Sequence, residues 1–417
     1  MEIVAQVGGK PGRDCGGFCE FCYFKNLDFK ELKSLRLGCR YCSSNQIGCR
    51  NCQDIINSVR VDFISPFNVL REIHAILLRN NFLGLLDNRN PRILVSSMAD
   101  IIFYPYLSQL LSVLKERDML VHLGYTSGKG IKNEEMAENI LSMGVDEISF
   151  SVFSINPEKR RKWMNDKTPE ESIKALKLFC ENIDVNASTV VIPGVIDIDE
   201  IFQIGSKLEE WGVKTFNLSN FANYKQQGLI LNKKPIIEEI TPYSHEDFLK
   251  IVKKVDDEFN FRIGGSPLYE PKRGIPFAIS EIKNKKYLEY LPRIKLEASI
   301  VTSKLAAFYI KKIIDVVDEE NLINIVSVNK EIADLITHED LEEINLVKLK
   351  RRIIIPGGAL VHDTFTEKIL SRDGTKRLII RGPNTLTPSW DLDKKKHIYF
   401  EINAFKELID TINSFPN

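Results

Sequence analysis

The chain has 417 residues, of which 43% are hydrophobic and 27% charged, and its 57 Lys and Arg residues balance 57 Asp and Glu residues. This composition is typical of a folded globular protein and excludes the collagen-like and disordered classes. The balanced charge argues against a nucleic-acid binder or a membrane-surface protein, since both usually carry a basic excess. No apolar run approaches the ~20 residues that a membrane-spanning helix needs.

The cysteines are unevenly distributed, because seven of the eight lie between Cys15 and Cys52. A chain of this length can build a core without disulfide staples. The N-terminus lacks a basic segment followed by an apolar one, so we expect no secretory signal and a cytoplasmic protein. In a reducing cytosol, clustered cysteines most often bind metal or carry out redox chemistry.

The predicted elements alternate between strand and helix as far as residue 218. Short apolar runs predict the strands, and apolar residues three to four positions apart predict the helices. Gly144 and Gly212 are expected to end two helices, because glycine readily adopts the left-handed backbone found there. Strands are expected at residues 3–7, 92–96, 119–123, 147–153, 185–192 and 215–218. Helices are expected at residues 67–79, 106–117, 133–143, 169–183 and 200–211.

Six such strands joined by helices predict an α/β fold with a parallel sheet and right-handed crossovers. The periodicity leaves two forms open, an open doubly wound sheet and a curved partial barrel of the TIM type. In both forms, ligands gather at the carboxyl ends of the strands. The alternation stops near residue 280, so we expect residues 1–280 to form one domain and residues 281–417 a separate α+β module.

A first group of cysteines directly follows the first predicted strand: Cys15, Cys19 and Cys22 have the spacing C-x3-C-x2-C. Three thiolates this close suit three irons of one 4Fe–4S cluster. The fourth iron is then left open, and an open coordination position marks a reactive metal site. A zinc site would need a fourth ligand nearby, and none of the six histidines lies before His74.

This spacing, with an aromatic side chain at Phe21, resembles the motif of the radical S-adenosylmethionine (radical SAM) superfamily. The resemblance implies a partial (β/α)6 barrel, in which SAM chelates the open iron and is cleaved to a 5′-deoxyadenosyl radical. In that superfamily the second strand usually ends in a Gly-Gly-Glu-like motif that holds the SAM amino group. Here the segment reads Ser-Ser-Met-Ala-Asp, so the resemblance makes Asp100 the anchor, with Phe21 and Ser151 as further SAM-binding candidates.

A second group of cysteines has the spacing C-x2-C-x6-C-x2-C, and a glycine precedes each pair. Each pair can clasp one side of a metal, and glycine allows the tight turns that aim backbone amides at the sulfurs. Four thiolates close the coordination sphere, so zinc and mononuclear iron stay equally open, with an auxiliary iron–sulfur cluster as a third option. The predicted metal loop spans residues 36–55 and contains Cys39, Cys42, Cys49 and Cys52.

The two cysteine groups together resemble the methanogenesis marker protein ten family, which are cobalamin-dependent radical SAM arginine methyltransferases acting on methyl-coenzyme M reductase. The resemblance runs through both cysteine groups, residues 124–130 and the C-terminal module. It implies mononuclear iron in the four-cysteine site and cobalamin held by the C-terminal module. It also implies a tyrosine that occupies the open iron until SAM displaces it, and Tyr104 is the best match to that tyrosine.

The function that the resemblance implies is C-methylation of an arginine side chain of methyl-coenzyme M reductase, giving 5-methylarginine. Methylcobalamin would be the methyl carrier, and an external electron donor would reduce the cluster. Neither nucleic acid nor a membrane is an expected partner. Two alternatives remain open: a cobalamin-independent radical SAM peptide-modifying enzyme with an auxiliary metal site, and a non-catalytic iron–sulfur electron carrier.

Overall fold

The computed structural model describes residues 2–27, 37–38, 61–82, 91–232, 234–388 and 394–414. The described chain forms two compact units. The first unit consists of the described residues within Met1–Leu27, Ile55–Asn223 and Ile236–Ser266. The second unit consists of the described residues within Asp28–Asp54, Tyr224–Pro235 and Pro267–Asn417. Among the described helices, none combines the length and the apolar character needed to cross a bilayer.

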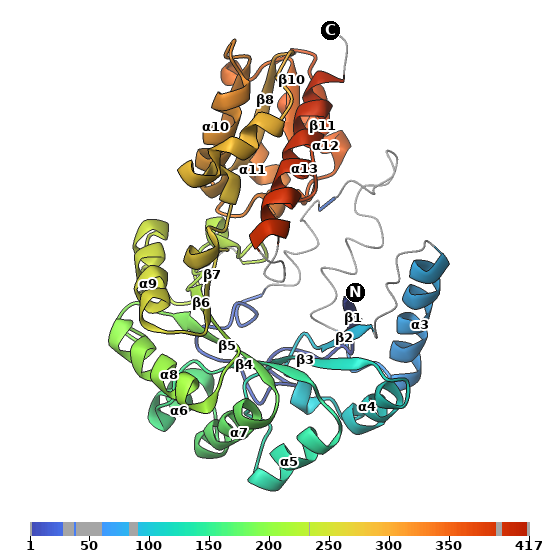
Figure 1. The fold of residues 1–417 in the computed structure, drawn as a ribbon, viewed down its shortest axis with the longest axis vertical. Helices are drawn as coiled ribbons and strands as arrows, with labels where there is room; N and C mark the ends of the chain where they lie inside the picture. The colour runs from blue at the N-terminus through green and yellow to red at the C-terminus, as the bar shows by residue number, and fades with distance from the viewer. Residues whose placement is uncertain are drawn as a thin grey trace. The chain divides into compact units, whose positions relative to one another are not determined.

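A parallel sheet of seven strands forms the centre of the first unit, and its strands follow one another in chain order (Figure 1). Each strand pairs in parallel with the next. Because successive strands are neighbours throughout, the sheet curves as a partial barrel. The strands are β1 (Glu2–Gln6), β2 (Arg92–Ser96), β3 (Leu120–Thr126), β4 (Glu147–Ser151), β5 (Asp184–Val191), β6 (Thr215–Asn220) and β7 (Arg262–Ser266).

Helices connect these strands and line the outer face of the curved sheet (Figure 1). Gly212 ends α8 with a φ of +84°, as expected, and the side chains of Asn133 and Asp197 cap the N-termini of α5 and α8. The predicted α/β fold with a parallel sheet is therefore confirmed. The helices are α3 (Pro66–Phe82), α4 (Leu107–Glu116), α5 (Glu134–Ser142), α6 (Pro157–Met164), α7 (Pro169–Asn182), α8 (Ile198–Trp211) and α9 (His245–Glu258), with the 3-10 turn η2 (Ile101–Phe103).

The sequence predicts six strands and misses β7, which reads Arg-Ile-Gly-Gly-Ser. Only Ile263 brings an apolar side chain, so the strand lacks the apolar run that identifies the others. Its glycines have a packing reason, because a Cβ on Gly265 would lie 3.0 Å from Val252 Cγ2 of α9. Glycine thus lets α9 approach β7 closely. The same glycines leave β7 without the run of apolar residues by which a strand is predicted.

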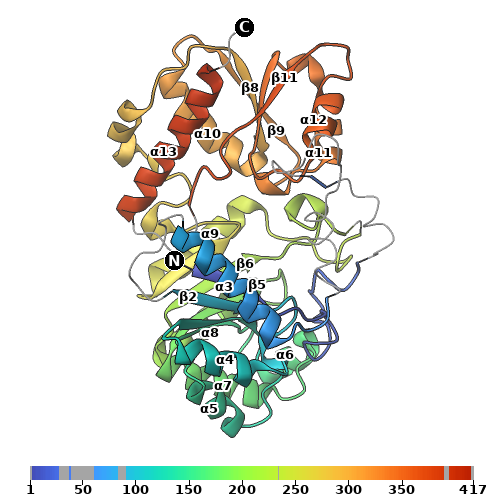
Figure 2. The ribbon, with the colours of Figure 1, turned by 90° about the vertical axis from the view of Figure 1, so that its right-hand side faces the viewer.

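The second unit contains a sheet of four parallel strands, of which β8, β9 and β11 are labelled in Figure 2. The order of its strands is β11-β10-β8-β9. This corrects the predicted α+β module, because every strand pair is parallel. When the four strands are numbered in chain order, their order across the sheet is 4-3-1-2, which read from the other edge is 2-1-3-4. This is the order of a doubly wound sheet, with a topological switch point between β8 and β10. The strands are β8 (Ala298–Ser303), β9 (Ile323–Val328), β10 (Arg352–Ile355) and β11 (Leu378–Arg381). The helices are α10 (Lys304–Val317), α11 (His338–Glu342), α12 (Asp363–Leu370) and α13 (Lys394–Asn413), with 3-10 turns η3 (Lys225–Gln227), η4 (Pro271–Arg273), η5 (Ala278–Ser280), η6 (Ile282–Tyr290), η7 (Ala333–Leu335) and η8 (Leu346–Lys348).

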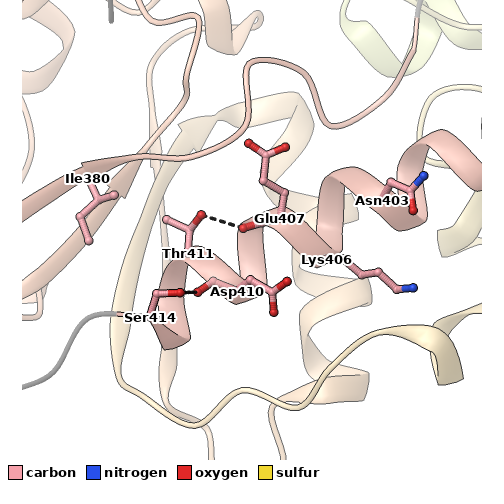
Figure 3. A pocket seen from close by; sticks show the side chains of 7 residues that line it. All are labelled: Ile380, Asn403, Lys406, Glu407, Asp410, Thr411 and Ser414. Atoms are coloured by element: carbon pink, nitrogen blue, oxygen red, sulfur yellow. Dashed lines mark hydrogen bonds between the residues drawn. The ribbon is translucent and has the colours of Figure 1, made fainter.

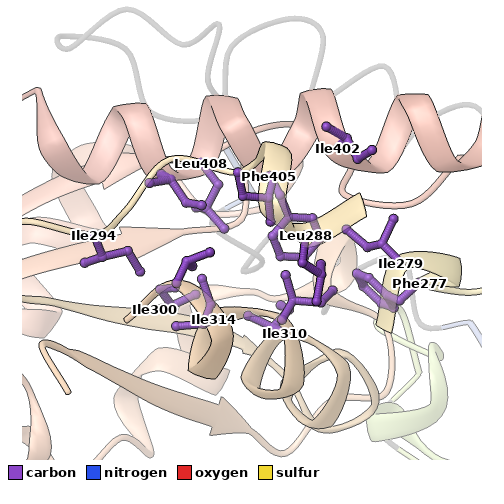
Figure 4. Packing of buried hydrophobic residues seen from close by; sticks show 14 of the residues in the cluster. Phe277, Ile279, Leu288, Ile294, Ile300, Ile310, Ile314, Ile402, Phe405 and Leu408 are labelled. Carbon is purple, nitrogen blue, oxygen red and sulfur yellow. The ribbon is translucent and has the colours of Figure 1, made fainter. Parts of the chain in front are cut away.

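Helices cover both faces of this second sheet. On one face, Ile300 and Ile354 belong to a core with α10 and α13 (Figure 4). On the other face, Val301, Ile353 and Ile355 belong to a core with α11 and α12. Neighbouring residues of β10 therefore enter opposite cores, and the strand reads as a continuous apolar run. Such a run is typical of a parallel strand that is buried on both faces.

The buried Glu401 of α13 holds a turn of the second unit in place. Its carboxylate accepts hydrogen bonds from the backbone N–H of Ile279 (3.0 Å) and from the hydroxyl of Thr387 (2.7 Å). Burial raises the pKa of Glu401 to about 7, although these bonds favour the charged form. A carboxyl group that titrates near neutrality inside a core links the stability of this unit to pH.

We predict that Glu401 makes the second unit less stable as the pH rises. The folded-state pKa of about 7 lies above the ordinary value of 4.5, so the folded state binds the proton more tightly than the unfolded state does. The resulting stabilisation is present at acid pH and is lost as the pH rises through the folded-state pKa, by at most about 3 kcal/mol. Urea unfolding should show a flatter pH dependence for Glu401→Gln than for the wild type. Equal slopes in the two proteins would contradict the prediction.

Candidate active site

Three cysteines lie on the loop that follows β1, at the carboxyl edge of the first unit's sheet. Cys19 is buried, whereas Cys15 and Cys22 are half-buried. The backbone N–H of Gly12 donates to Cys15 Sγ (3.1 Å), and the backbone N–H of Cys22 donates to the Cys19 carbonyl (3.1 Å). Residues 7–27 contain neither helix nor strand. The shape of this cysteine loop therefore depends on its turns and on contacts from other segments.

Glycines give the cysteine loop its tight path. Gly12, Gly16 and Gly17 have φ values of +83°, +68° and +99°, a region that side chains with a Cβ rarely adopt. Gly17 also lies against Asn165, where a Cβ would be 2.2 Å from Asn165 Nδ2. Asn165 is the left-handed residue that ends α6. A side chain at position 17 would have to adopt this left-handed backbone and displace the Asn165 side chain.

The segment around α6 holds the second half of the cysteine loop. The backbone N–H of Glu20 donates to the Trp163 carbonyl (2.8 Å). The ring of Phe21 stacks on that of Phe153, which follows β4, with 4.6 Å between the ring centroids. Phe21 is therefore in a packed position beside the cysteines, and its predicted role in SAM binding remains a prediction.

Lys129, in the turn after β3, joins the cysteine loop to α6. Its Nζ donates to the carbonyl oxygens of Gly17 (2.8 Å) and Met164 (2.9 Å) and lies 3.8 Å from Cys19 Sγ. The sequence analysis includes this residue only as part of the segment 124–130. A lysine between two glycines, directly after a strand, is the signal by which it could have been found.

Burial raises the pKa of all three thiols, that of Cys22 to about 12, while the charge of Lys129 acts in the opposite direction on each. Metal binding needs thiolates, so loading this site with iron would release protons. Among the described residues, no three His, Cys, Asp or Glu side chains are grouped to hold a metal ion. Cysteines that bind separate irons of one cluster need no such grouping, and their soft sulfur donors fit an iron–sulfur cluster.

Asp100 is fully buried between the ends of β2 and β3. Its carboxylate accepts hydrogen bonds from the backbone N–H and the hydroxyl of Ser127 (both 2.8 Å) and from the backbone N–H of Ile102 (3.1 Å). Burial raises the pKa of Asp100, and the bonds from Ser127 lower it. Its backbone N–H also donates to the carbonyl of Asp14 in the cysteine loop (3.3 Å). The structure thus gives Asp100 a positioning role, and the SAM anchor remains a prediction.

A buried ion pair extends this polar network to α6. Arg160 Nη2 lies 2.7 Å from Asp166 Oδ2, and the guanidinium also donates to the carbonyl oxygens of Val152 and Ser127. The other oxygen of Asp166 accepts the backbone N–H of Thr168 (3.1 Å). These bonds compensate the burial of both charges, which would otherwise be costly. They tie the ends of β3 and β4 to α6, and the sequence analysis misses both residues.

Two tyrosines near the site differ in their surroundings. The hydroxyl of Tyr104 donates to the Ile64 carbonyl (2.8 Å), and burial raises the pKa of Tyr104 to about 12. Tyr125, near the end of β3, is 41% exposed. The pKa of Tyr125 is raised well above its ordinary value, first by burial of the hydroxyl and then by the charge of Cys19. Tyr104 as an iron ligand remains a prediction, and Tyr125 is the neighbouring tyrosine with which it can be compared.

The remaining predicted site residues are only partly described. Ser151 is buried at the carboxyl end of β4, where it pairs in register with Ser188 of β5. This position places Ser151 at the sheet edge that carries the cysteine loop, and its role in SAM binding remains a prediction. The four cysteines of the predicted metal loop lie outside the described residues: Cys39, Cys42, Cys49 and Cys52.

A hollow of about 570 Å³ lies beside α13 in the second unit (Figure 3). The hydroxyls of Thr411 and Ser414 donate to carbonyl oxygens of their own helix, those of Glu407 (2.7 Å) and Asp410. The charged side chains in its lining are Lys406, Glu407 and Asp410. None of the candidate site residues that the structure describes lines this hollow, so the cysteine loop remains the centre of the candidate active site.

The comparison with protein families gives one match within this chain. Residues 36–204 match the Radical SAM superfamily. This part of the chain is therefore similar to radical SAM proteins, a superfamily that implies a 4Fe–4S cluster and SAM. The matched residues begin after Cys22, so the assignment of the three cysteines to the cluster depends on their spacing and on the loop that carries them.

Several solved structures are distantly similar to the chain, and no curated protein matches it. SuiB of Streptococcus suis, bound to the precursor peptide SuiA, is 14% identical with a TM-score of 0.41, over 64% of this chain and 48% of SuiB. A radical SAM methyltransferase from Sphaerobacter thermophilus is 14% identical with a TM-score of 0.37, over 55% of this chain and 63% of the other. TsrM from Kitasatospora setae, with tryptophan and a SAM analogue bound, is 13% identical with a TM-score of 0.32, over 52% of this chain and 35% of TsrM. This chain spans about half the length of SuiB, and these likenesses are too distant to bear on the substrate.

We predict that Gly17→Ala prevents the cysteine loop from taking the shape that binds the cluster. The new Cβ would lie 2.2 Å from Asn165 Nδ2, at a φ of +99°. Cluster content after anaerobic reconstitution, measured as acid-labile sulfide, should fall several-fold.

Gly194→Ala is the matched control for this variant. Gly194 also has a positive φ, of +75°, but no atom lies within 4 Å of the new Cβ. This variant should lose only about 1–2 kcal/mol through its left-handed backbone and should keep its cluster content. Equal sulfide content in the two variants would contradict the prediction.

Proposed function

We propose that this chain is a radical SAM enzyme that C-methylates an arginine side chain of methyl-coenzyme M reductase, giving 5-methylarginine. The observation that carries the radical SAM part is the loop with Cys15, Cys19 and Cys22 at the carboxyl edge of a parallel sheet, in a chain that matches the superfamily. The arginine substrate, the use of cobalamin and an iron in the four-cysteine loop rest on the resemblance to the methanogenesis marker protein ten family.

In this proposal, the cysteine loop holds the cluster and leaves one iron free for SAM. The chemistry that the bound groups supply is a 5′-deoxyadenosyl radical for hydrogen abstraction and a cobalt-bound methyl group for transfer. An sp3 side-chain carbon has no lone pair with which to attack a sulfonium, so its methylation needs such a radical route. The chain's own contribution is to bury Cys19 and to pack Phe21 on Phe153, which excludes water from one side of the loop.

The doubly wound sheet of the second unit supports a corrinoid site there. Ligands of such sheets bind outside the carboxyl ends of the strands at the topological switch point. In this unit that point lies between the loops that follow β8 and β10. His362, in the loop after β10, is buried, and its Nδ1 accepts the backbone N–H of Thr364 (3.1 Å) as the N-cap of α12. A corrinoid at the switch point would therefore meet a His362 whose Nδ1 is already engaged in the cap of α12.

The direct test is anaerobic reconstitution, followed by incubation with dithionite, SAM, cobalamin and an arginine-containing peptide of the reductase. We expect 5′-deoxyadenosine and a peptide heavier by one CH2, read by mass spectrometry. Cys19→Ala should abolish both products, because it removes a cluster ligand. Cys180→Ala, which changes a buried thiol in α7, is the matched control and should keep both.

The possible outcomes separate the proposal from its alternatives. A peptide that loses hydrogens or keeps its mass would favour a cobalamin-independent peptide-modifying enzyme. Failure of the wild type to form 5′-deoxyadenosine would favour an electron carrier and would contradict the proposal.

We predict that Tyr104→Phe changes the electron paramagnetic resonance (EPR) spectrum of the reduced cluster when SAM is absent, because a phenolate would no longer reach the open iron. Loss of the bond to the Ile64 carbonyl should cost only about 1 kcal/mol, so the fold should persist. Tyr125→Phe is the matched comparison and should leave the spectrum unchanged. A spectrum that changes in Tyr125→Phe and not in Tyr104→Phe would transfer this role to Tyr125.

A further inference from the structure

Lys129 differs from the other cations around the cysteine loop because it forms no ion pair with a described carboxylate. Arg160, on the other side of Ser127, is paired with Asp166. The cations of the loop itself are also paired with carboxylates: Lys10 with Asp62, Arg13 with Asp14 and Asp62, and Lys25 with Glu20. Within the part of the chain that the structure describes, no carboxylate is paired with Lys129.

The three contacts of the Lys129 ammonium are the carbonyl oxygens of Gly17 and Met164 and the sulfur of Cys19. The two carbonyl bonds suffice to join the cysteine loop to α6. The third contact places a positive charge 3.8 Å from a cysteine sulfur. A half-buried ammonium without a carboxylate partner is unfavourable unless another negative charge compensates it. At this position, such a charge would come from the Cys19 sulfur once it binds an iron of the cluster.

Lys129 lies next to a sulfur that would bind one iron of the cluster, because its ammonium is 3.8 Å from Cys19 Sγ. Iron–sulfur clusters bound by thiolates become more negative when they accept an electron. A fixed positive charge close to the sulfurs, and hydrogen bonds to them, stabilise the reduced state and raise the reduction potential.

We propose that Lys129 is a positioning residue that holds Cys19 against α6 and sets the reduction potential of the cluster bound by the loop. The inference rests on the proposed function, because it needs a cluster at Cys15, Cys19 and Cys22. It assigns to this lysine a task for the first step of the reaction, in which the cluster accepts one electron from an external donor. By raising the potential, Lys129 makes that electron transfer more favourable.

The test compares two substitutions at Lys129. Lys129→Met keeps a side chain of similar length and removes both the charge and the donors. Lys129→Arg keeps the charge and can still donate to the two carbonyl oxygens. Lys132→Met is the matched control, since it removes an exposed charge three residues further along the same segment. The midpoint potential of the cluster is measured in each reconstituted protein by a redox titration followed by EPR.

We expect Lys129→Met to reduce the equilibrium constant for one-electron reduction at least about tenfold, which lowers the midpoint potential by ~59 mV or more. Lys129→Arg should stay close to the wild type, and Lys132→Met should match it. An unchanged potential in Lys129→Met would overturn the proposal. So would an equal shift in Lys129→Arg, because the charge would then not be its cause.

Two further readouts keep the outcomes distinct. If Lys129→Met binds no cluster, hydrogen exchange of the metal-free protein tests the positioning role. Backbone amides of residues 12–22 should then exchange faster in Lys129→Met than in Lys132→Met. Equal exchange in the two variants would reject the positioning role. A wild type that binds no cluster would contradict the proposed function and this inference together. A wild type that forms 5′-deoxyadenosine, with Lys129→Met at the wild-type potential, would contradict this inference alone.

Discussion

The candidate site depends on one constraint: its three cysteines lie on a loop that has no helix or strand of its own, so other segments must give it its shape. Bonds come from three directions: from the carbonyl oxygens of Trp163 and Met164 at the end of α6, from Lys129 after β3 and from Asp100 after β2. These segments meet because parallel strands end at the same edge of a sheet. The sheet thereby positions cysteines that it does not contain.

Ser127 joins the two buried charged groups that support this edge. Its backbone N–H and hydroxyl donate to Asp100, and its carbonyl accepts the guanidinium of Arg160, which is paired with Asp166. Removing one partner of such a buried pair leaves an uncompensated charge, at a cost of about 3–5 kcal/mol. The network therefore opposes any movement of the strand ends beneath the cysteine loop. Asp100, which the family resemblance makes the SAM anchor, is fully enclosed by protein and belongs to this network.

Local patterns were sufficient to predict β1 to β6, the helices between most of them and the position of the first cysteine group. They were not sufficient for β7, whose glycines carry no apolar signal, or for the second unit, where the run Ile353-Ile354-Ile355 indicates a strand buried on both faces rather than an α+β module. The role of Lys129 could not be predicted from a local pattern either, because it depends on a contact with Cys19, which is 110 positions away in the sequence.

The cysteine loop also differs from small metal-stabilised domains in how folding and metal binding are linked. In zinc fingers the metal organises an otherwise unfolded chain, so binding free energy is folding free energy. Here glycines, backbone bonds and Lys129 already hold the loop against α6 and the ends of β2 and β3. Burial raises the pKa of its thiols, so a metal has to take the place of their protons. Cluster binding then needs deprotonation but little ordering of the backbone, so its affinity should depend on pH more than on the stability of the loop.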